Sequence, residues 1–166
     1  MAAANTYTPI FTTTLSSTAS SVTFSSIPST YTDLILIASP VQSADYISLQ
    51  FNGDTGTSYS ITTVNGQGAT AVSNRQTSVA KLRTGWYAYP SSSSLGNYIG
   101  IASIMNYANT TTYKTVLSRA NNSAAGTEAI VGLWRSSAAI TSMTVLSETG
   151  NIAIGSTFSL YGITAA

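Results

Sequence analysis

The sequence contains few side chains that could carry out acid–base, nucleophilic or metal chemistry. It has no histidine and no cysteine among its 166 residues. A Ser–His–Asp triad, a cysteine nucleophile and a zinc site of the usual ligand types are therefore excluded. No glycine-rich loop ends in the Lys-Ser or Lys-Thr pair that binds nucleotide phosphates.

One enzyme class is compatible with this composition, namely glycoside hydrolysis by a pair of carboxylates. The candidates for such a pair are the acidic residues Asp33, Asp45, Asp54, Glu128 and Glu148. Asp54 lies in a predicted turn, and the other four lie at the edges or flanks of predicted strands, where acids serve turn formation and solubility. We therefore expect a non-enzymatic protein with no catalytic residue and no cofactor, and a carboxylate-dependent depolymerase is the enzyme alternative.

The segment Asn52-Gly53-Asp54-Thr55-Gly56 permits two interpretations. Side-chain oxygens of Asn52, Asp54 and Thr55 are the kind of ligand that Ca²⁺ prefers. Asn and Gly also tolerate the positive φ that a tight hairpin requires. Because the loop holds a single carboxylate, the sequence favours a hairpin turn, and we predict no metal site.

Aromatic side chains are the candidates for binding, since the chain has 10 tyrosines and 2 tryptophans. Trp86, Tyr87 and Tyr89 lie beside a run of serines and are the best candidates for exposure. An exposed aromatic ring can stack on a sugar or anchor a protein interface, and core or hairpin packing is the alternative. Trp134 is flanked by apolar residues, so we predict that it lies in the core.

The charge content constrains the partners. Charged residues make up 7% of the chain, and the net charge is +1. Lysines and arginines form no cluster, which argues against a nucleic-acid partner and a polybasic membrane anchor. No signal peptide is expected in Met1–Leu15, and the longest apolar run is too short to cross a bilayer. A surface of Ser, Thr, Asn and Tyr avoids desolvating ions when identical neighbours pack together, so we expect a homo-oligomer.

Apolar and polar residues alternate in short runs between turn signals, and no stretch has a sustained helical period. Strands are predicted over residues 7–15, 21–27, 33–39, 45–52, 59–64, 97–106, 112–119, 128–135, 140–147 and 157–163. Residues 79–82 and 86–89 are candidates for short strands, and Asn65-Gly66 is predicted to begin a turn. The pattern predicts one all-β domain over residues 1–166, an antiparallel, jelly-roll-like β-sandwich.

The segment Asp33–Ser39 is apolar at successive positions, so both of its faces are apolar. Two interpretations follow from this pattern. The strand is covered on each side within the domain, or one of its faces lies in a contact between subunits.

Several segments together resemble one family of proteins. They include Val22-Thr23-Phe24-Ser25-Ser26-Ile27-Pro28, Tyr31-Thr32-Asp33-Leu34-Ile35-Leu36, Phe51-Asn52-Gly53-Asp54-Thr55-Gly56, Gly132-Leu133-Trp134-Arg135-Ser136 and Gly155-Ser156-Thr157-Phe158-Ser159-Leu160-Tyr161-Gly162-Ile163. The pattern is similar to that of the small stand-alone β-sandwich structural proteins of tailed phages, including those of cyanobacteria and aquatic bacteria. Residues 67–96 carry the least of this resemblance.

The resemblance implies a component of the virion surface and no catalytic residues. The expected function is a capsid decoration or cement protein that contacts itself, by analogy as a trimer, and other virion proteins such as the major capsid protein. The alternative is a tail or head fibre or appendage protein that contacts a tail or fibre protein and binds a host surface glycan.

Overall fold

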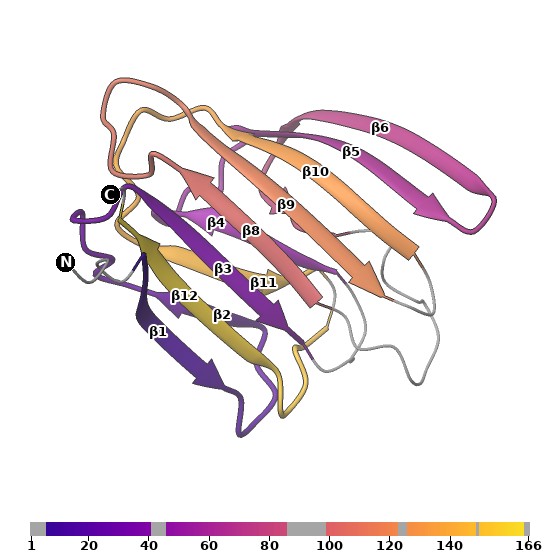
Figure 1. The fold of residues 1–166 in the computed structure, drawn as a ribbon, viewed down its shortest axis with the longest axis horizontal. Coiled ribbons are helices and arrows are strands. Elements are labelled where there is room, and N and C mark those ends of the chain that lie inside the picture. Colours follow the sequence, from indigo (N-terminus) through magenta and orange to yellow (C-terminus); the bar gives the residue numbers. More distant parts are fainter. Residues whose placement is uncertain (1–5, 41–45, 86–98, 123–125, 149, 165–166) are drawn as a thin grey trace.

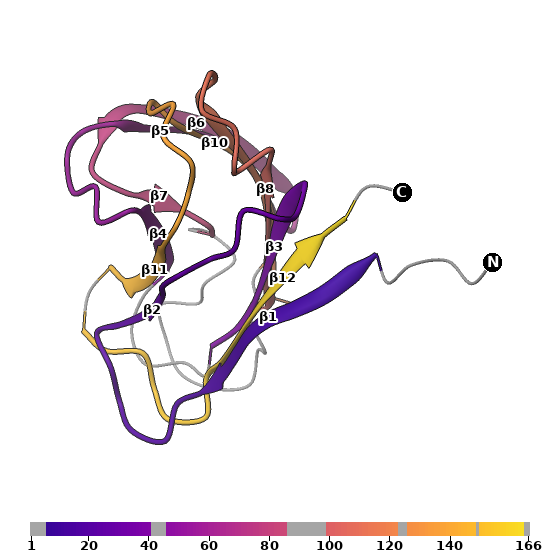
Figure 2. The ribbon, with the colours of Figure 1, turned by 90° about the vertical axis from the view of Figure 1, so that its left-hand side faces the viewer.

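The structure is a computed structural model that describes residues 6–40, 46–85, 99–122, 126–148 and 150–164. The described residues form two antiparallel sheets that face each other as two layers (Figures 1 and 2). None of the described residues belongs to a helix that is long and apolar enough to cross a membrane.

The larger sheet has eight strands. In order across the sheet they are β1 (Tyr7–Thr14), β12 (Thr157–Ile163), β3 (Asp33–Ser39), β8 (Ile99–Met105), β9 (Lys114–Asn122), β10 (Gly126–Trp134), β5 (Tyr59–Gln67) and β6 (Thr70–Val79). The smaller sheet has four strands, in the order β2 (Ser21–Phe24), β11 (Met143–Ser147), β4 (Ile47–Phe51) and β7 (Leu82–Arg83).

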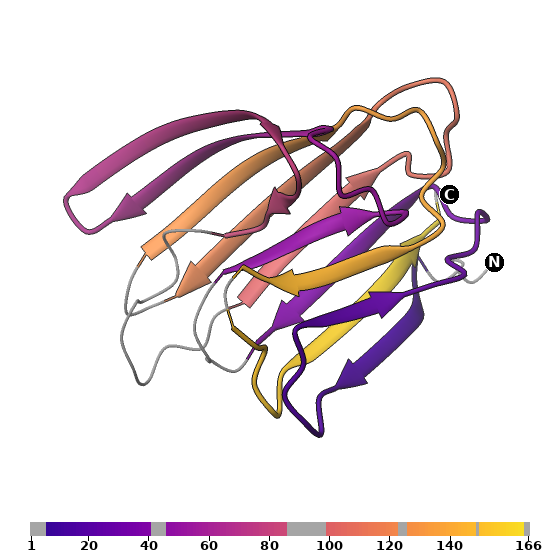
Figure 3. The same ribbon diagram turned by 180° about the vertical axis from the view of Figure 1, so that it is seen from behind.

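The strand order is that of a jelly roll with an extended sheet. The strands β1-β12-β3-β8 form one layer and β2-β11-β4-β7 form the other, and the chain passes back and forth between them. Strands β9, β10, β5 and β6 extend the first layer, and the β5–β6 hairpin projects past the smaller sheet (Figure 3). The predicted jelly-roll-like β-sandwich is confirmed.

The core fills the space between the two sheets. Alternate residues of each strand point inward, as strand geometry requires, so Leu34 and Leu36 of β3 are buried against the smaller sheet. Phe51, Tyr59 and Trp134 form an aromatic cluster with ring centroids 5.6–6.3 Å apart. Trp134 is 2% exposed, which confirms its predicted place in the core.

The turn predicted at Asn65-Gly66 is wrong. Both residues continue β5, and they pair with Glu128 and Thr127 of β10. The turn follows at Gly68, whose φ is +63°. Pairing along β10 outweighs the local turn preference of the Asn-Gly dipeptide. The same effect extends β9 through Asn122.

Between residues 67 and 85 the predicted strands also differ from the observed ones. Strand β6 was not predicted, because its Ser, Asn, Arg, Gln and Thr residues lack the apolar alternation of a half-buried strand. The candidate strand at 79–82 is divided, since β6 ends at Val79 and β7 begins at Leu82. The candidate strand at 86–89 lies outside the described residues.

A substitution at Gly132 of β10 tests how closely the two sheets pack. A Cβ atom at this position would lie 2.2 Å from Cδ1 of Leu82, which is fully buried in β7. Gly132→Ala is expected to destabilise the fold by about 1–3 kcal/mol, because overpacking forces the core to shift. The measurement is denaturant unfolding followed by tryptophan fluorescence.

Gly66→Ala in the neighbouring strand is the matched control, since a Cβ atom there meets nothing within 4 Å. It is expected to change stability by at most about 0.5 kcal/mol. Equal losses for the two variants would contradict close packing of Leu82 on Gly132.

Candidate interaction surface

The outward face of the larger sheet carries apolar side chains where an antiparallel sheet exposed to water normally carries polar ones. Its exposed apolar residues include Val131, which is 51% exposed, Leu117 at 48% and Met105 at 41%. We call this surface the outer face. Its apolar members are Ile35, Ile37, Val64, Ile99, Ile101, Met105, Leu117, Val131, Leu133 and Tyr161.

Strand register places the apolar residues of the outer face side by side. Ile35 of β3 pairs with Tyr161 of β12 on one side and with Ser103 of β8 on the other. Ser103 in turn pairs with Leu117 of β9, and Leu117 pairs with Val131 of β10. Directly paired residues on one face lie about 4.5–5.5 Å apart, so this row is continuous across five strands.

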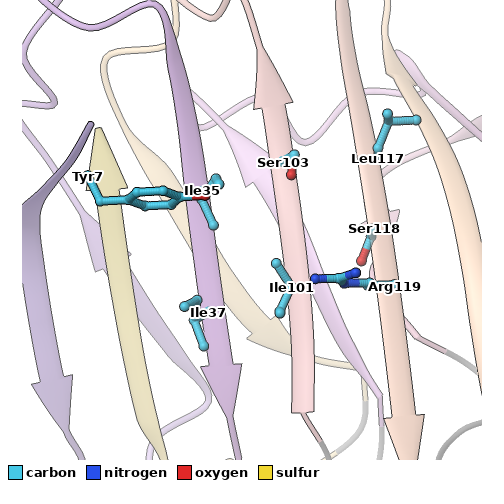
Figure 4. Close-up of a pocket in the computed structure, with 8 residues that line it drawn as sticks. All are labelled: Tyr7, Ile35, Ile37, Ile101, Ser103, Leu117, Ser118 and Arg119. Atoms are coloured by element: carbon cyan, nitrogen blue, oxygen red, sulfur yellow. The ribbon is translucent and has the colours of Figure 1, made fainter. Parts of the chain in front are cut away.

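The surface of this face is hollowed between β3 and β9. A depression of about 430 Å³ is lined by side chains of β1, β3, β8 and β9. Figure 4 shows Tyr7 extending from β1 across β12 towards Ile35. The guanidinium of Arg119 extends from β9 towards Ile101. The depression is therefore mainly apolar, with one cation at its edge.

The two faces of β3 differ in burial. Its inward residues Leu34 and Leu36 are buried, but Ile37 on the outer face is 36% exposed. The described part of the chain does not cover this strand on both sides. For the described residues, the first interpretation of the apolar segment 33–39, cover on each side within the domain, does not hold, and the contact between subunits stays a prediction.

The outward surface of the smaller sheet is polar and charged, unlike the outer face of the larger sheet. Thr23 and Thr144 exchange a hydrogen bond of 3.0 Å across β2 and β11. Glu148 forms ion pairs with Lys81 at 2.9 Å and with Arg83 at 3.6 Å. The contrast shows that the apolar character belongs to one face of the sandwich.

Most of the charged groups that the structure describes are bound within the fold. Lys114 is 1% exposed, and its Nζ donates to the carbonyl oxygens of Thr112 at 2.7 Å and Ser137 at 3.2 Å. Burial lowers the pKa of this amine. Arg135 donates to the carbonyl of Thr57.

The Asn52–Gly56 segment is a structural turn. Asn52 Oδ1 accepts from the backbone N–H groups of Thr141 and Ser142. Asp54 accepts from the Trp134 indole N–H at 2.7 Å and from the Gly56 N–H at 2.9 Å. The hydrogen bond from Trp134 is the largest contribution that lowers the pKa of the Asp54 carboxyl. These oxygens already accept protein hydrogen bonds, as in a turn. The predicted hairpin is wrong, because β4 belongs to the smaller sheet and β5 to the larger one, so this turn begins the connection between the two sheets.

The other acidic candidates are also integrated into the fold. Asp33 accepts from the Asn106 N–H at 2.6 Å, and Glu148 accepts from Ser48 in addition to its two ion pairs. Glu128 was predicted to flank a strand, but it lies within β10 and is 1% exposed, because β10 begins at Gly126. Asp45 lies outside the described residues. Among those described, no three acidic side chains gather to hold a metal ion.

The interior becomes polar at one end of the larger sheet, which the sequence did not predict. Glu128 pairs across the sheet with Asn65, and both point inward near Thr63 of β5 and Asn122 of β9. These four side chains are 1–3% exposed. Polar residues at neighbouring inward positions of β5, β9 and β10 are the signal that could have indicated this feature, but the register of these strands is needed to recognise that they are neighbours.

The predicted binding residues Trp86, Tyr87 and Tyr89 lie outside the described residues, and their role stays a prediction. The outer face was not predicted as a site, although the segment 33–39 suggested one of its strands. No known protein family matches the chain, and no curated protein resembles its sequence closely enough to count as a relative.

Tyr59 provides a test of the turn that holds Asp54 in place. Its hydroxyl accepts from the Phe51 N–H at 3.0 Å and donates to the Asp54 carbonyl at 3.1 Å. Burial raises its pKa from 10.0 to about 12. The protonated hydroxyl therefore stabilises the fold below pH 10, and this contribution is lost as the pH rises towards 12.

The expected result is that wild type is more stable than Tyr59→Phe at neutral pH and that the difference shrinks between pH 10 and about 12. Chemical unfolding at a series of pH values measures this. Tyr113→Phe, at a residue that is 56% exposed, controls for loss of a tyrosine. A constant difference between wild type and Tyr59→Phe would contradict the assignment.

Proposed function

We propose that this chain is a non-enzymatic structural protein of a tailed-phage particle, a decoration or cement protein that assembles as an oligomer on the virion surface. The observation that carries the structural role is the apolar outer face of β3, β8, β9 and β10. The assignment to a tailed-phage particle rests on the sequence resemblance. A cement protein needs a broad apolar surface that another molecule can cover, and the exposed apolar residues of the outer face offer such a surface.

The outer face suits a permanent contact more than a transient one. Obligate interfaces are more apolar than transient ones and resemble a domain core. Across the row from Ile35 to Val131 no charged residue occurs, and Arg119 lies in the neighbouring row. Covering these side chains removes apolar surface from water with little desolvation of ions, which stabilises association.

Leu117→Lys tests whether the outer face is covered on assembly. Leu117 is 48% exposed in the single chain, so the substitution is expected to leave the fold intact. A charge in the middle of an apolar contact is expected to weaken association roughly tenfold or more. Sedimentation velocity over a range of concentrations measures the effect.

Thr23→Lys is the matched control, because it adds the same charge on the outward surface of the smaller sheet, away from the outer face. It is expected to leave association unchanged. If both variants associate like wild type, the outer face is not an oligomer contact.

Antibody–gold labelling of intact particles tests the proposed location. Gold spread over the head, together with heat-sensitive and osmotically fragile particles when the protein is absent, is the expected result. Particles without the protein that survive heat and osmotic shock unchanged would contradict a cement function.

A fibre or appendage protein that binds glycans is the second candidate. A groove of about 440 Å³ on the smaller sheet is lined by polar residues that include Ser20, Ser21, Gln50 and Lys81. Hydroxyl, amide and ammonium groups are suitable partners for sugar hydroxyls. Gold confined to the tail, and binding of the recombinant protein to host cells, would favour this candidate.

A further inference from the structure

Three of the four sheet edges in the described part of the chain are protected from pairing with another strand. Strand β2 has 4 residues and β7 has 2, and short edge strands pair weakly. Strand β1 contains Pro9, which lacks an N–H, and its register with β12 shifts between Pro9 and Phe11. Natural sheets use these features to prevent association at their edges.

The fourth edge, β6, has none of these features over Thr70–Gln76, and its register with β5 shifts only beyond Gln76, towards Val79. It is 10 residues long, contains no proline, and pairs without a register shift from Gln76 to Thr70. Its residues are exposed on both faces, apart from Gln76 and Val79, which are partly buried. Val72 is 40% exposed although it neighbours the inward residue Asn65, because this end of the hairpin projects past the smaller sheet (Figure 3).

The hairpin register shows which backbone groups point to the open edge. Gln67 pairs with Thr70 around a two-residue turn, so these two residues exchange hydrogen bonds within the hairpin. Hydrogen-bonded and non-hydrogen-bonded pairs then alternate along an antiparallel ladder. The N–H and C=O groups of Ala71, Ser73 and Arg75 therefore point away from β5.

We propose that β6 pairs in antiparallel fashion with β6 of a second copy of this chain, which joins two eight-stranded sheets into one. A second β6 is already extended and free of bulges over Thr70–Gln76, so pairing requires no refolding. The contact is isologous and closes after two copies, so a dimer is the unit of assembly. A trimer, expected by analogy, does not contain such a contact.

The charges of β6 are compatible with pairing to itself. Arg75 is its one charged residue. Pairing centred on Ser73 places Arg75 opposite Ala71 of the second copy, because both lie two residues from the centre. Like charges directly opposite each other destabilise a sheet, and this register keeps the two guanidiniums apart.

The pairing also orients the outer faces. A two-fold axis between antiparallel strands of one sheet is perpendicular to that sheet, so both outer faces point to the same side. The dimer therefore presents twice the apolar surface of one copy on a single side. That this surface contacts a capsid shell rests on the proposed function. The β6 contact itself does not depend on the shell.

Single cysteines test the pairing directly, because the natural chain contains none. Ser73→Cys is expected to form a disulfide-linked dimer under mild oxidation, since paired residues in a sheet lie within the Cα distance that a disulfide spans. Ala71→Cys is expected to cross-link much less, because register places its copies far apart. Thr127→Cys, exposed on β10, measures the background of random collisions.

A second pair of variants tests the backbone contact. Ser73→Pro removes an N–H that faces the open edge, and it is expected to abolish the dimer in sedimentation velocity. Ser73→Thr keeps the N–H and is expected to leave the dimer intact. Circular dichroism verifies that both variants fold.

The β6 proposal is overturned if Ser73→Cys cross-links no faster than Thr127→Cys, or if the folded Ser73→Pro variant remains a dimer. A trimer as the smallest assembly would also overturn it. Leu117→Lys separates the two proposals, since it weakens contacts of the outer face and leaves the Ser73→Cys cross-link in place.

Discussion

The structure depends on one constraint, which is that strands β3, β8 and β10 of the larger sheet carry apolar residues on both faces. Inward residues such as Leu34 and Ile104 pack against the smaller sheet and form the core. Outward residues such as Ile37 and Leu117 have no layer above them in the described part of the chain. A sandwich of two layers buries one face of each sheet, so the described residues leave the second apolar face of the larger sheet uncovered, and our proposal is that another molecule covers it.

The distribution of charge follows the same constraint. Glu148, Asp54 and Lys114 are paired or bound away from the outer face, and Arg119 lies at the edge of the depression in this face. Threonine and serine form the periphery of this face, as in the hydrogen bond between Thr14 and Thr157. The outer face therefore has an apolar centre and a polar rim, which is the usual anatomy of a protein interface.

The strands could be predicted from the sequence where alternation and turn residues agreed. The predicted ranges 33–39 and 157–163 coincide with β3 and β12. The turn at Asn65-Gly66 failed because pairing with β10 extends β5, and β6 was missed because both of its faces are exposed. The outer face could not be derived from the sequence, because outward residues are identified only by register and by the absence of a covering layer. Only the doubly apolar segment 33–39 indicated it.

Radical footprinting of the methionines tests the central claim most directly. Met105 lies on the outer face and is 41% exposed, whereas Met143 is fully buried in the core. The account predicts that Met105 is oxidised rapidly in dilute protein and becomes protected in the assembled state, while Met143 is unreactive in both. Equal oxidation of Met105 before and after assembly would show that the outer face stays in water, and would contradict the account.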